Sequence, residues 1–262
     1  MSDSLAGRSA VVCGSTQGIG RACAVALAEA GASVTLVARN RDALESVRSA
    51  LPSGAGQTHY TVQADFSDWE TVRRHMLAHI EAHGPAHVLV NNSGGPPAGP
   101  AFEGTPQAYM DAFEQHLLCN QVLVQSVAPG MRDAGYGRII NILSTSVITP
   151  IMNLGVSNTI RGAVANWART LAAELGPSGI TVNNVLPGFV ATARLGAIVQ
   201  GRANRSGMSV EEVETQMKSA LPARRFGEPE ELGAVIAFLA SPAAAYINGV
   251  NLPVDGGRLA AQ

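Results

Sequence analysis

The sequence is poor in charged residues, in aromatic residues and in cysteine. Charged residues make up 15% of the 262 positions, aromatic residues make up 5%, and the formal net charge is −2. This composition lacks the basic excess that binding to nucleic acid or to an anionic membrane surface requires. The three cysteines, Cys13, Cys23 and Cys119, are odd in number and lie in apolar segments. We therefore expect buried thiols in a reducing compartment and no disulfide framework.

Long apolar runs are also missing. The first residues, Met-Ser-Asp-Ser-Leu-Ala-Gly-Arg, do not form the apolar segment of a signal peptide. No uninterrupted apolar run reaches the length that a membrane-spanning helix needs. These features predict a cytoplasmic protein with neither a membrane partner nor a nucleic-acid partner.

Metal-binding motifs are scarce as well. His75, His79 and His83 recur every four residues in a segment expected to be helical, which would bring their imidazoles to one face. The order of residues there is His-Ile-Glu-Ala-His and not the His-Glu-x-x-His of zinc proteases. A solvated outer face is therefore favoured over a zinc site, and we predict no metal.

The chain does contain a regular alternation of apolar strand-like runs and helical segments. Strands that are apolar throughout are typical of a parallel sheet covered on both faces. We therefore predict an α/β fold, a Rossmann-type doubly wound parallel sheet of about seven strands with helices on both faces. Strands are expected at 9–13, 33–38, 58–64, 87–90, 139–143, 180–186 and 250–254. Helices are expected at 21–30, 42–50, 67–83, 105–132 with a disturbance at Pro129, from 156 to a stop at 176–177, 210–220 and 229–240.

No linker, repeat or low-complexity segment divides the chain. Residues 1–262 are therefore predicted to form a single dinucleotide-binding domain. Within it, residues 189–226 are expected to form a mostly irregular flap beside the site, with a polar segment at 201–209.

A glycine-rich turn follows the first expected strand. Gly14, Gly18 and Gly20 stand between that strand and the first helix, the context that a dinucleotide-binding fingerprint requires. Gly14 would allow the sharp turn, Gly18 would let the backbone approach a pyrophosphate, and Gly20 would let helix and strand pack closely. The amino end of the helix would then supply N–H donors to the phosphates.

The end of the second strand indicates which dinucleotide is preferred. A site for NAD places a carboxylate there to hold the ribose hydroxyls, but this chain has Ala38, followed by Arg39 and Arg41. Guanidinium groups match phosphate geometry. NADP(H) is therefore favoured over NAD(H), and Asp42 is expected to cap the following helix.

Polar residues around the fifth expected strand mark the place for chemistry. Ser144 follows the strand 139–143, and Ser157 and Arg161 lie four residues apart on the next helix and so share a face. Ligands of open α/β sheets bind beyond the carboxyl ends of the strands. Ser157 can also be explained as the N-cap of its helix. Arg161 is harder to explain without an anionic or ribose partner.

With these residues, the chain resembles the short-chain dehydrogenase/reductase family, and within it the 3-oxoacyl-carrier-protein reductases. The shared motifs are the glycine-rich turn, Asn91-Asn92-Ser93-Gly94, Gly137-Arg138-Ile139-Ile140-Asn141-Ile142, Pro187-Gly188 with Thr192, and Val254-Asp255-Gly256-Gly257. The resemblance covers almost the whole chain. It implies a cofactor site made of Gly14, Ser15, Thr16, Gln17, Gly18, Ile19, Gly20, Arg39, Asp65, Phe66, Asn91, Ser93, Gly94, Arg161, Pro187, Gly188 and Thr192.

The catalytic residues of that family are matched only in part. The family uses an asparagine, a serine, and a tyrosine four residues before a lysine. Ser144 matches the serine, but Ser157 stands at the tyrosine position and Arg161 at the lysine position. His116 stands at the asparagine position, with Asn120 one turn later as the other candidate. A serine hydroxyl is a far weaker acid than a tyrosine, and arginine stays protonated where lysine can relay a proton.

Three functions remain compatible with this pattern. The first is an NADP(H)-dependent oxidoreductase acting on a C=O or CH–OH group, in which Ser144 holds the oxygen and His116, with a pKa near neutrality, or a water delivers the proton. The second is a nucleotide-binding sensor or oligomer partner without turnover. The third is non-redox chemistry, as in the halohydrin dehalogenases, which resemble this family and carry arginine at the lysine position but lack the glycine-rich loop.

The substrate itself is not determined by the sequence. The resemblance implies a small carbonyl or hydroxy compound, free or linked to an acyl carrier, and a homotetramer. The flap carries Arg194, Arg202 and Arg205, which would either meet an anionic substrate or carrier or lie on a solvated surface. The pattern does not decide between these two roles.

Overall fold

The computed structural model describes residues 4–54 and 56–261, which fold around one seven-stranded sheet. The strand order is β3-β2-β1-β4-β5-β6-β7, and every neighbouring pair is parallel. The bounds are β1 Ser9–Cys13, β2 Ser33–Ala38, β3 Tyr60–Gln63, β4 Val88–Asn91, β5 Gly137–Ile142, β6 Ile180–Pro187 and β7 Asn251–Val254. The predicted fold class is therefore confirmed.

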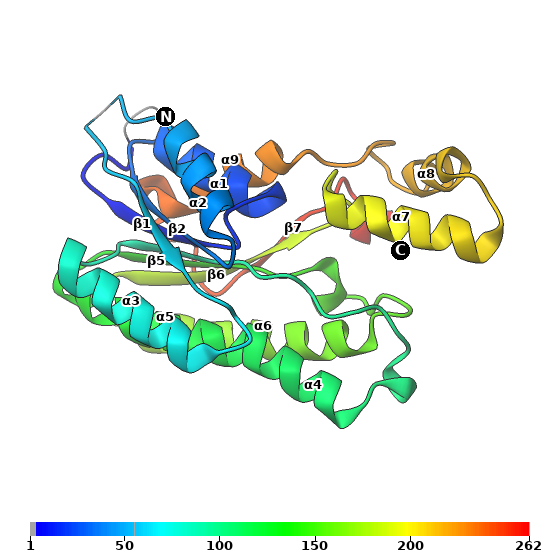
Figure 1. Ribbon diagram of the computed structural model, residues 1–262, viewed down its shortest axis with the longest axis horizontal. Coiled ribbons are helices and arrows are strands. Elements are labelled where there is room, and N and C mark those ends of the chain that lie inside the picture. Colours follow the sequence, from blue (N-terminus) through cyan, green and yellow to red (C-terminus); the bar gives the residue numbers. More distant parts are fainter. Residues whose placement is uncertain (1–3, 55, 262) are drawn as a thin grey trace.

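Helices cover both faces of this sheet (Figure 1). Helices α1, α2 and α9 lie on one face, and α3, α5 and α6 lie on the other, so the sheet separates two apolar layers. This explains why the central strands are apolar throughout and do not alternate. The bounds are α1 Gly18–Glu29, α2 Arg41–Ala50, α3 Trp69–His83, α4 Pro106–Phe113, α5 Cys119–Asp133, α6 Gly155–Leu175, α7 Ala193–Ser206, α8 Val210–Ser219 and α9 Pro229–Ala240.

The strand order reverses between β1 and β4, which creates the crevice where ligands bind in such sheets. Beyond the carboxyl end of β4, Asn92 closes part of this crevice. Its Nδ2 donates to the carbonyl oxygens of Cys13 and Gly14, at 3.2 and 3.3 Å. Helices α7 and α8 project beyond the sheet on the side of β7's carboxyl end (Figure 1). The crevice and the flap therefore share one edge of the sheet.

A row of asparagine side chains crosses the sheet and was not foreseen from the sequence. Asn91, Asn141, Asn184 and Asn251 occupy matching positions on β4, β5, β6 and β7. Each donates from Nδ2 to the Oδ1 of the next, at 2.8, 2.9 and 2.8 Å. The first three are almost completely buried. Hydrogen bonds between buried amides offset the cost of removing them from water, so the row ties the four strands together.

The segment expected to be one helix over 105–132 consists of three parts. Helix α4 runs into a π-helical turn, Glu114–Leu118, and α5 follows. The predicted disturbance at Pro129 is wrong, because α5 continues through that proline. The irregularity lies instead at the π turn, which contains His116. Such turns often occur at functional sites because the extra residue redirects side chains.

The flap is more regular than predicted. Residues 193–206 form helix α7, whereas an irregular segment was expected there. Leu195, Val199 and Ala203 recur every four residues and bury one stripe of the helix against α8. Gly196 and Gly201 within the helix obscure this periodicity in the sequence.

Two predicted helix caps are also corrected. Asn40, and not Asp42, caps α2, because its Oδ1 accepts the N–H of Ala43 at 3.0 Å. Helix α6 begins at Gly155 after Leu154, so Ser157 lies inside its first turn and is not its N-cap. The capping explanation of Ser157 is therefore wrong.

The three helical histidines pack against the sheet edge and do not gather around a metal. His79 Nε2 lies 2.9 Å from Thr35 Oγ1, and the ring of His83 stacks on Tyr60. His75 Nδ1 lies 2.8 Å from a backbone carbonyl of β3. Within residues 4–54 and 56–261, no group of three or more potential ligands is placed to hold a metal ion. The face of α3 that carries these histidines is therefore less exposed to solvent than predicted.

The cysteines are buried and free, as predicted. No helix in the described part of the chain has the length and apolar character to cross a membrane.

Candidate active site

The glycine-rich turn forms a close-packed cradle at the carboxyl end of β1. Gly14 and Gly18 have φ of 58° and 51°, values that favour glycine. A Cβ on Gly20 would lie 2.1 Å from the carbonyl oxygen of Gly14, and one on Gly14 would lie 2.7 Å from Asn92. The roles predicted for Gly14 and Gly20 therefore have a geometric basis, because any side chain there would push the turn apart.

The amino end of α1 is open toward this cradle. Its N-cap residue, Gln17, makes no side-chain hydrogen bond to the first turn, so the first backbone N–H groups remain available to an anion. Three other residues of this turn were predicted to contact the cofactor. Ser15 is buried, with its Oγ 3.4 Å from the carbonyl oxygen of Val37. Thr16 precedes Gln17, and Ile19 packs against the apolar core. This arrangement fits a pyrophosphate.

The predicted adenosine side lies at the ends of β2 and β3. Arg39 is exposed there, and its carbonyl accepts a hydrogen bond from Gln63. The Asp65 carboxylate accepts the N–H of Ser67 at 3.0 Å. Phe66 is buried among apolar side chains, so we expect any contact of Phe66 with a ligand to come from its backbone.

The other predicted cofactor residues lie around the same crevice. Asn91 is committed to the asparagine row through its side chain, whereas Gly94 is exposed with open space around it. Thr192, the N-cap of α7, lies over the glycine turn, because a Cβ on Gly18 would be 3.1 Å from its methyl group. Pro187 ends β6, and the following Gly188 packs so closely on Asp255 that a Cβ would lie 2.7 Å from its Cα.

Arg161 joins α6 to the end of β5 beside Ser144. Its Nε donates to Ser157 Oγ at 3.1 Å. Its Nη1 donates to the carbonyl oxygens of Ile142 and Leu143, at 3.2 and 2.9 Å. Ser157 is buried, and Ser144 is partly exposed, with its Oγ accepting the N–H of Ser146 at 3.1 Å. The structure thus brings three of the four predicted catalytic residues to one strand end.

The environment of Arg161 disfavours its positively charged form. Burial, and then the positive charge of Arg194, lower the pKa of Arg161 to about 10. Because it is buried, the guanidinium donates its hydrogen bonds to carbonyl and hydroxyl oxygens of the protein. Arg161 therefore remains a cation at neutral pH, and its hydrogen bonds to Ser157, Ile142 and Leu143 fix its position in the site.

His116, the fourth predicted catalytic residue, is buried and neutral. Its Nδ1 lies 2.9 Å from Ser93 Oγ, and its Nε2 has no hydrogen-bond partner in the described part of the chain. Burial, Arg161 and Arg194, in that order, lower the pKa of His116 to about 3. The expectation of a pKa near neutrality is therefore wrong, and the ring can offer a hydrogen bond but not a positive charge.

None of the four tyrosines replaces the one missing from the motif. Tyr109 donates to the carbonyl of Ala101 at 3.3 Å, and Tyr136 donates to a backbone carbonyl of α9. Tyr60 stacks against His83, and Tyr246 is fully exposed. The hydroxyl groups that follow β5 are therefore those of serine and threonine, with Thr145 Oγ1 accepting a hydrogen bond from Arg258 at 2.9 Å.

Two further residues next to the site, Arg194 and Gly95, were not among the predicted site residues. Arg194, in the first turn of α7, donates to the carbonyl oxygens of Gly95 and Pro96, at 3.1 and 3.3 Å. A Cβ on Gly95 would meet the guanidinium groups of both Arg194 and Arg161. Arg194 was noted with two other flap arginines, but the pattern gave no reason to select it, since its neighbours come from distant segments.

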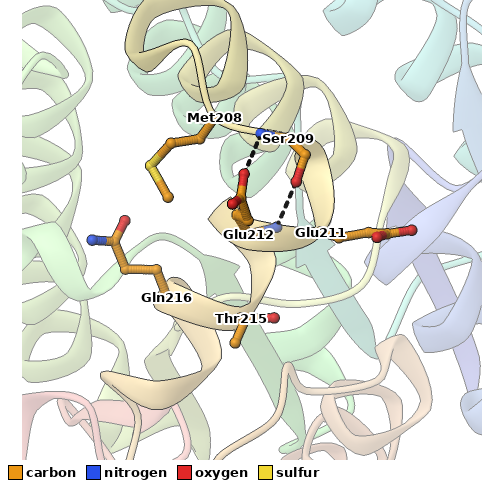
Figure 2. A pocket seen from close by; sticks show the side chains of 6 residues that line it. All are labelled: Met208, Ser209, Glu211, Glu212, Thr215 and Gln216. Atoms are coloured by element: carbon orange, nitrogen blue, oxygen red, sulfur yellow. Dashed lines mark hydrogen bonds between the residues drawn. The ribbon is translucent and has the colours of Figure 1, made fainter.

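A second hollow lies away from this site (Figure 2). It is lined by Met208, Ser209, Glu211, Glu212, Thr215 and Gln216 at the start of α8. Ser209 and Glu212 form reciprocal capping hydrogen bonds there, drawn as dashed lines in Figure 2. These polar groups satisfy each other at the helix start, so the hollow lacks the converging free donors of the crevice.

Comparison with known proteins identifies related reductases. Residues 14–258 match the family described as enoyl-(acyl carrier protein) reductase. The NADPH-dependent reductase BacG of Bacillus subtilis is 34% identical over 96% of this chain and 98% of its own. A 3-oxoacyl-[acyl-carrier-protein] reductase of Staphylococcus epidermidis is 31% identical over 95% and 98%.

Solved structures lead to the same family. The L-sorbose reductase of Gluconobacter frateurii, crystallised with NADPH and L-sorbose, superposes with a TM-score of 0.92 at 30% identity, covering 99% of both chains. Among the relatives found by sequence, the short-chain reductase protein NovJ of Streptomyces niveus is 34% identical over 95% of this chain and 93% of its own. With its parallel sheet, its glycine cradle and these relatives, the chain belongs to the short-chain dehydrogenase/reductase family.

Proposed function

We propose that this protein is an NADP(H)-dependent oxidoreductase that reduces a carbonyl group or oxidises the corresponding alcohol. The observation that carries the proposal is the position of Arg161, which ties Ser157 to the end of β5 beside Ser144, at the same sheet edge as the glycine cradle. The relatives support the cofactor, since BacG is an NADPH-dependent reductase and the sorbose reductase was crystallised with NADPH.

The residues around the crevice fit this cofactor. The open first turn of α1 would hold the pyrophosphate, and exposed Arg39 would pair with the 2′-phosphate of the adenosine. Thr192 and the 93–95 turn would border the nicotinamide side. When bound, NADPH supplies a hydride; this chain must hold the substrate oxygen and provide a proton.

The atypical serine and arginine positions can perform that second task. Ser144 would donate a hydrogen bond to the substrate oxygen, and the charge on Arg161 would stabilise the negative charge that develops there. Ser157 would pass its hydroxyl proton to this oxygen while its Oγ takes a proton from a water molecule. Arg161 stays a cation throughout and holds the Ser157 hydroxyl through its Nε.

The finer assignments extend this proposal. The reductase relative from Staphylococcus epidermidis supports an acyl-carrier-linked substrate as one candidate, and the sorbose reductase supports a small free one. We further propose a cytoplasmic homotetramer, as the family resemblance implies.

Nucleotide titration tests the proposal directly. Fluorescence titration with NADPH and NADH should show tighter binding of NADPH. Ketones, sugars, and 3-oxoacyl and enoyl thioesters should then be screened for NADPH oxidation. The Ser144→Ala variant should bind NADPH normally and lose about 100-fold or more in kcat. Tight NADPH binding without any turnover across the panel would favour the sensor instead, and no nucleotide binding would favour non-redox chemistry.

A paired substitution tests the atypical relay. Ser157→Tyr combined with Arg161→Lys restores the residues that the family normally carries. If turnover of the native substrate falls while general ketone reduction rises, the native pair is adapted to its own substrate. Unchanged rates with both substrates would contradict a role for Ser157 and Arg161 in proton transfer.

A further inference from the structure

Two arginine side chains from different elements meet beside Gly95. A Cβ on Gly95 would lie 2.7 Å from Nη2 of Arg194 and 3.1 Å from Nη2 of Arg161. Atoms that both lie so close to one point are at most about 6 Å apart, a separation at which like charges repel appreciably. Helix α7 and helix α6 therefore hold two positive charges in one small volume.

Neither positive charge is neutralised by an acidic residue. Arg194 donates to two backbone carbonyls of the 95–96 turn, and Arg161 donates to Ser157 and to two backbone carbonyls at the end of β5. In residues 4–54 and 56–261, neither arginine forms a salt bridge. Burial and Arg194 lower the pKa of Arg161, and no carboxylate acts to raise it. An anion bound between the two guanidinium groups would offset their mutual repulsion and accept hydrogen bonds from both.

An unsatisfied polar group borders the same space. His116 is buried to more than nine-tenths, its Nδ1 contacts Ser93, two residues before Gly95, and its Nε2 has no partner in the described chain. After burial, the charges of Arg161 and Arg194 are the causes that lower the pKa of His116. A neutral imidazole can hydrogen-bond a ligand without adding a third charge.

We propose that Arg161 and Arg194 bind a carboxylate of the substrate, and that the substrate is a 2-oxo or 3-oxo acid. Arg161 also contacts the carbonyl of Leu143, the residue before Ser144. An anion held by this guanidinium would lie on the Ser144 side of the site, which suits a carboxylate attached close to the carbonyl group that Ser144 holds. This inference rests on the proposed reductase function and gives its substrate class.

The other flap arginines do not share this role. Arg202 lies over the ring of Phe189, with its Cζ 5.9 Å from the centroid, and Arg205 is exposed in the last turn of α7. Because Arg194 stands on the flap, binding of an anion would also hold the flap against the 95–96 turn. Arg205 thus offers a matched control, with the same charge on the same helix.

Calorimetric titration of acetoacetate into the NADP⁺-loaded protein tests the inference, because no reduction can occur with the oxidised cofactor. We expect acetoacetate to bind, and its uncharged methyl ester to bind at least 10-fold more weakly. Arg194→Gln should weaken acetoacetate binding by about 10- to 100-fold and leave the methyl ester unaffected. Gly95→Ala, which fills the space between the guanidinium groups, should have the same direction of effect. Arg205→Gln should behave as the wild type.

Three outcomes would overturn the inference. One is equal binding of acetoacetate to Arg194→Gln and Arg205→Gln, and another is equal affinity for the acid and its ester. The third is a cofactor phosphate as the anion: Arg194→Gln would then weaken NADP⁺ binding itself, and acetoacetate would bind only without nucleotide. Failure of the proposed function has a different signature, namely acetoacetate binding as expected but no oxidation of NADPH with any oxo acid.

Discussion

The asparagine row gives a quantitative prediction about stability. Replacing Asn141 with Leu keeps the branching and the number of heavy atoms of the side chain, although Leu is larger, and removes the partner of Asn91 Nδ2 and of Asn184 Oδ1. Both of these neighbours are almost completely buried. A buried polar group without a partner costs about 1–3 kcal/mol. The free energy of unfolding should therefore fall by about 2–6 kcal/mol, with the lower part of this range reflecting apolar burial of the new side chain.

The end of the row provides the matched control. Asn251 is half-buried and accepts from a single neighbour, Asn184, whose Nδ2 also lies 3.5 Å from the carbonyl of Ala165. Asn251→Leu should therefore cost about 1–2 kcal/mol, because at most one buried donor loses its best acceptor.

Equilibrium unfolding in guanidinium chloride, followed by circular dichroism, would measure both changes. For a domain of this size, each kcal/mol corresponds to about 2–4 °C in Tm, so thermal melting should separate the two variants clearly. NADPH titration of Asn141→Leu would show whether the row also positions the turn after β4. The reasoning is refuted if Asn141→Leu is no less stable than Asn251→Leu.

Three further predictions follow from single contacts. Arg39→Asp should weaken NADPH binding by about 10- to 100-fold and leave NADH binding nearly unchanged, which fluorescence titration would measure; similar losses with both nucleotides would exclude a 2′-phosphate contact. Burial, with a smaller contribution from His83, lowers the pKa of His79 to about 4 in the folded protein, so the unfolded chain takes up a proton first. Stability should fall as the pH drops from about 6.5 toward 4, and His79→Gln should flatten this decline in urea unfolding. Gly155→Ala should lower the free energy of unfolding by about 1–3 kcal/mol, because its methyl group would lie 2.2 Å from the Cα of Ala101. Gly162→Ala on the same helix has open space around it and should raise the free energy of unfolding by about 0.5–1 kcal/mol. Equal effects of the two substitutions in denaturant unfolding would contradict the close packing at Gly155.

The regular parts of the fold were predictable because each depends on a short-range pattern. The apolar strands at 9–13 and 33–38 agree with the structure residue for residue. The π turn at Glu114–Leu118 was not predictable, because its residues have ordinary helical character and the turn depends on packing around them. Helix α7 was missed because its apolar stripe is narrow and interrupted by glycines.

In the candidate site, too, local features were predictable and features that depend on distant segments were not. The glycine cradle is a local feature, since it requires φ values that only its own residues determine. Ser157 and Arg161 are identified as atypical only through the resemblance to the family, which implies a tyrosine and a lysine at these positions. The charge state of His116 was predicted wrongly, because the burial and the two cations that lower its pKa come from three segments distant in sequence.

By itself, the sequence determined a parallel α/β sheet and a dinucleotide cradle. These follow from periodicity, backbone conformation and spacing, which act over a few residues. Only the tertiary structure decided that Arg161 contacts the end of β5, that Arg194 reaches across to Gly95, and that neither arginine has a salt bridge among the described residues. Such features depend on the distance between segments that are far apart along the chain, because Coulomb and hydrogen-bond energies depend on separation in space and not in sequence.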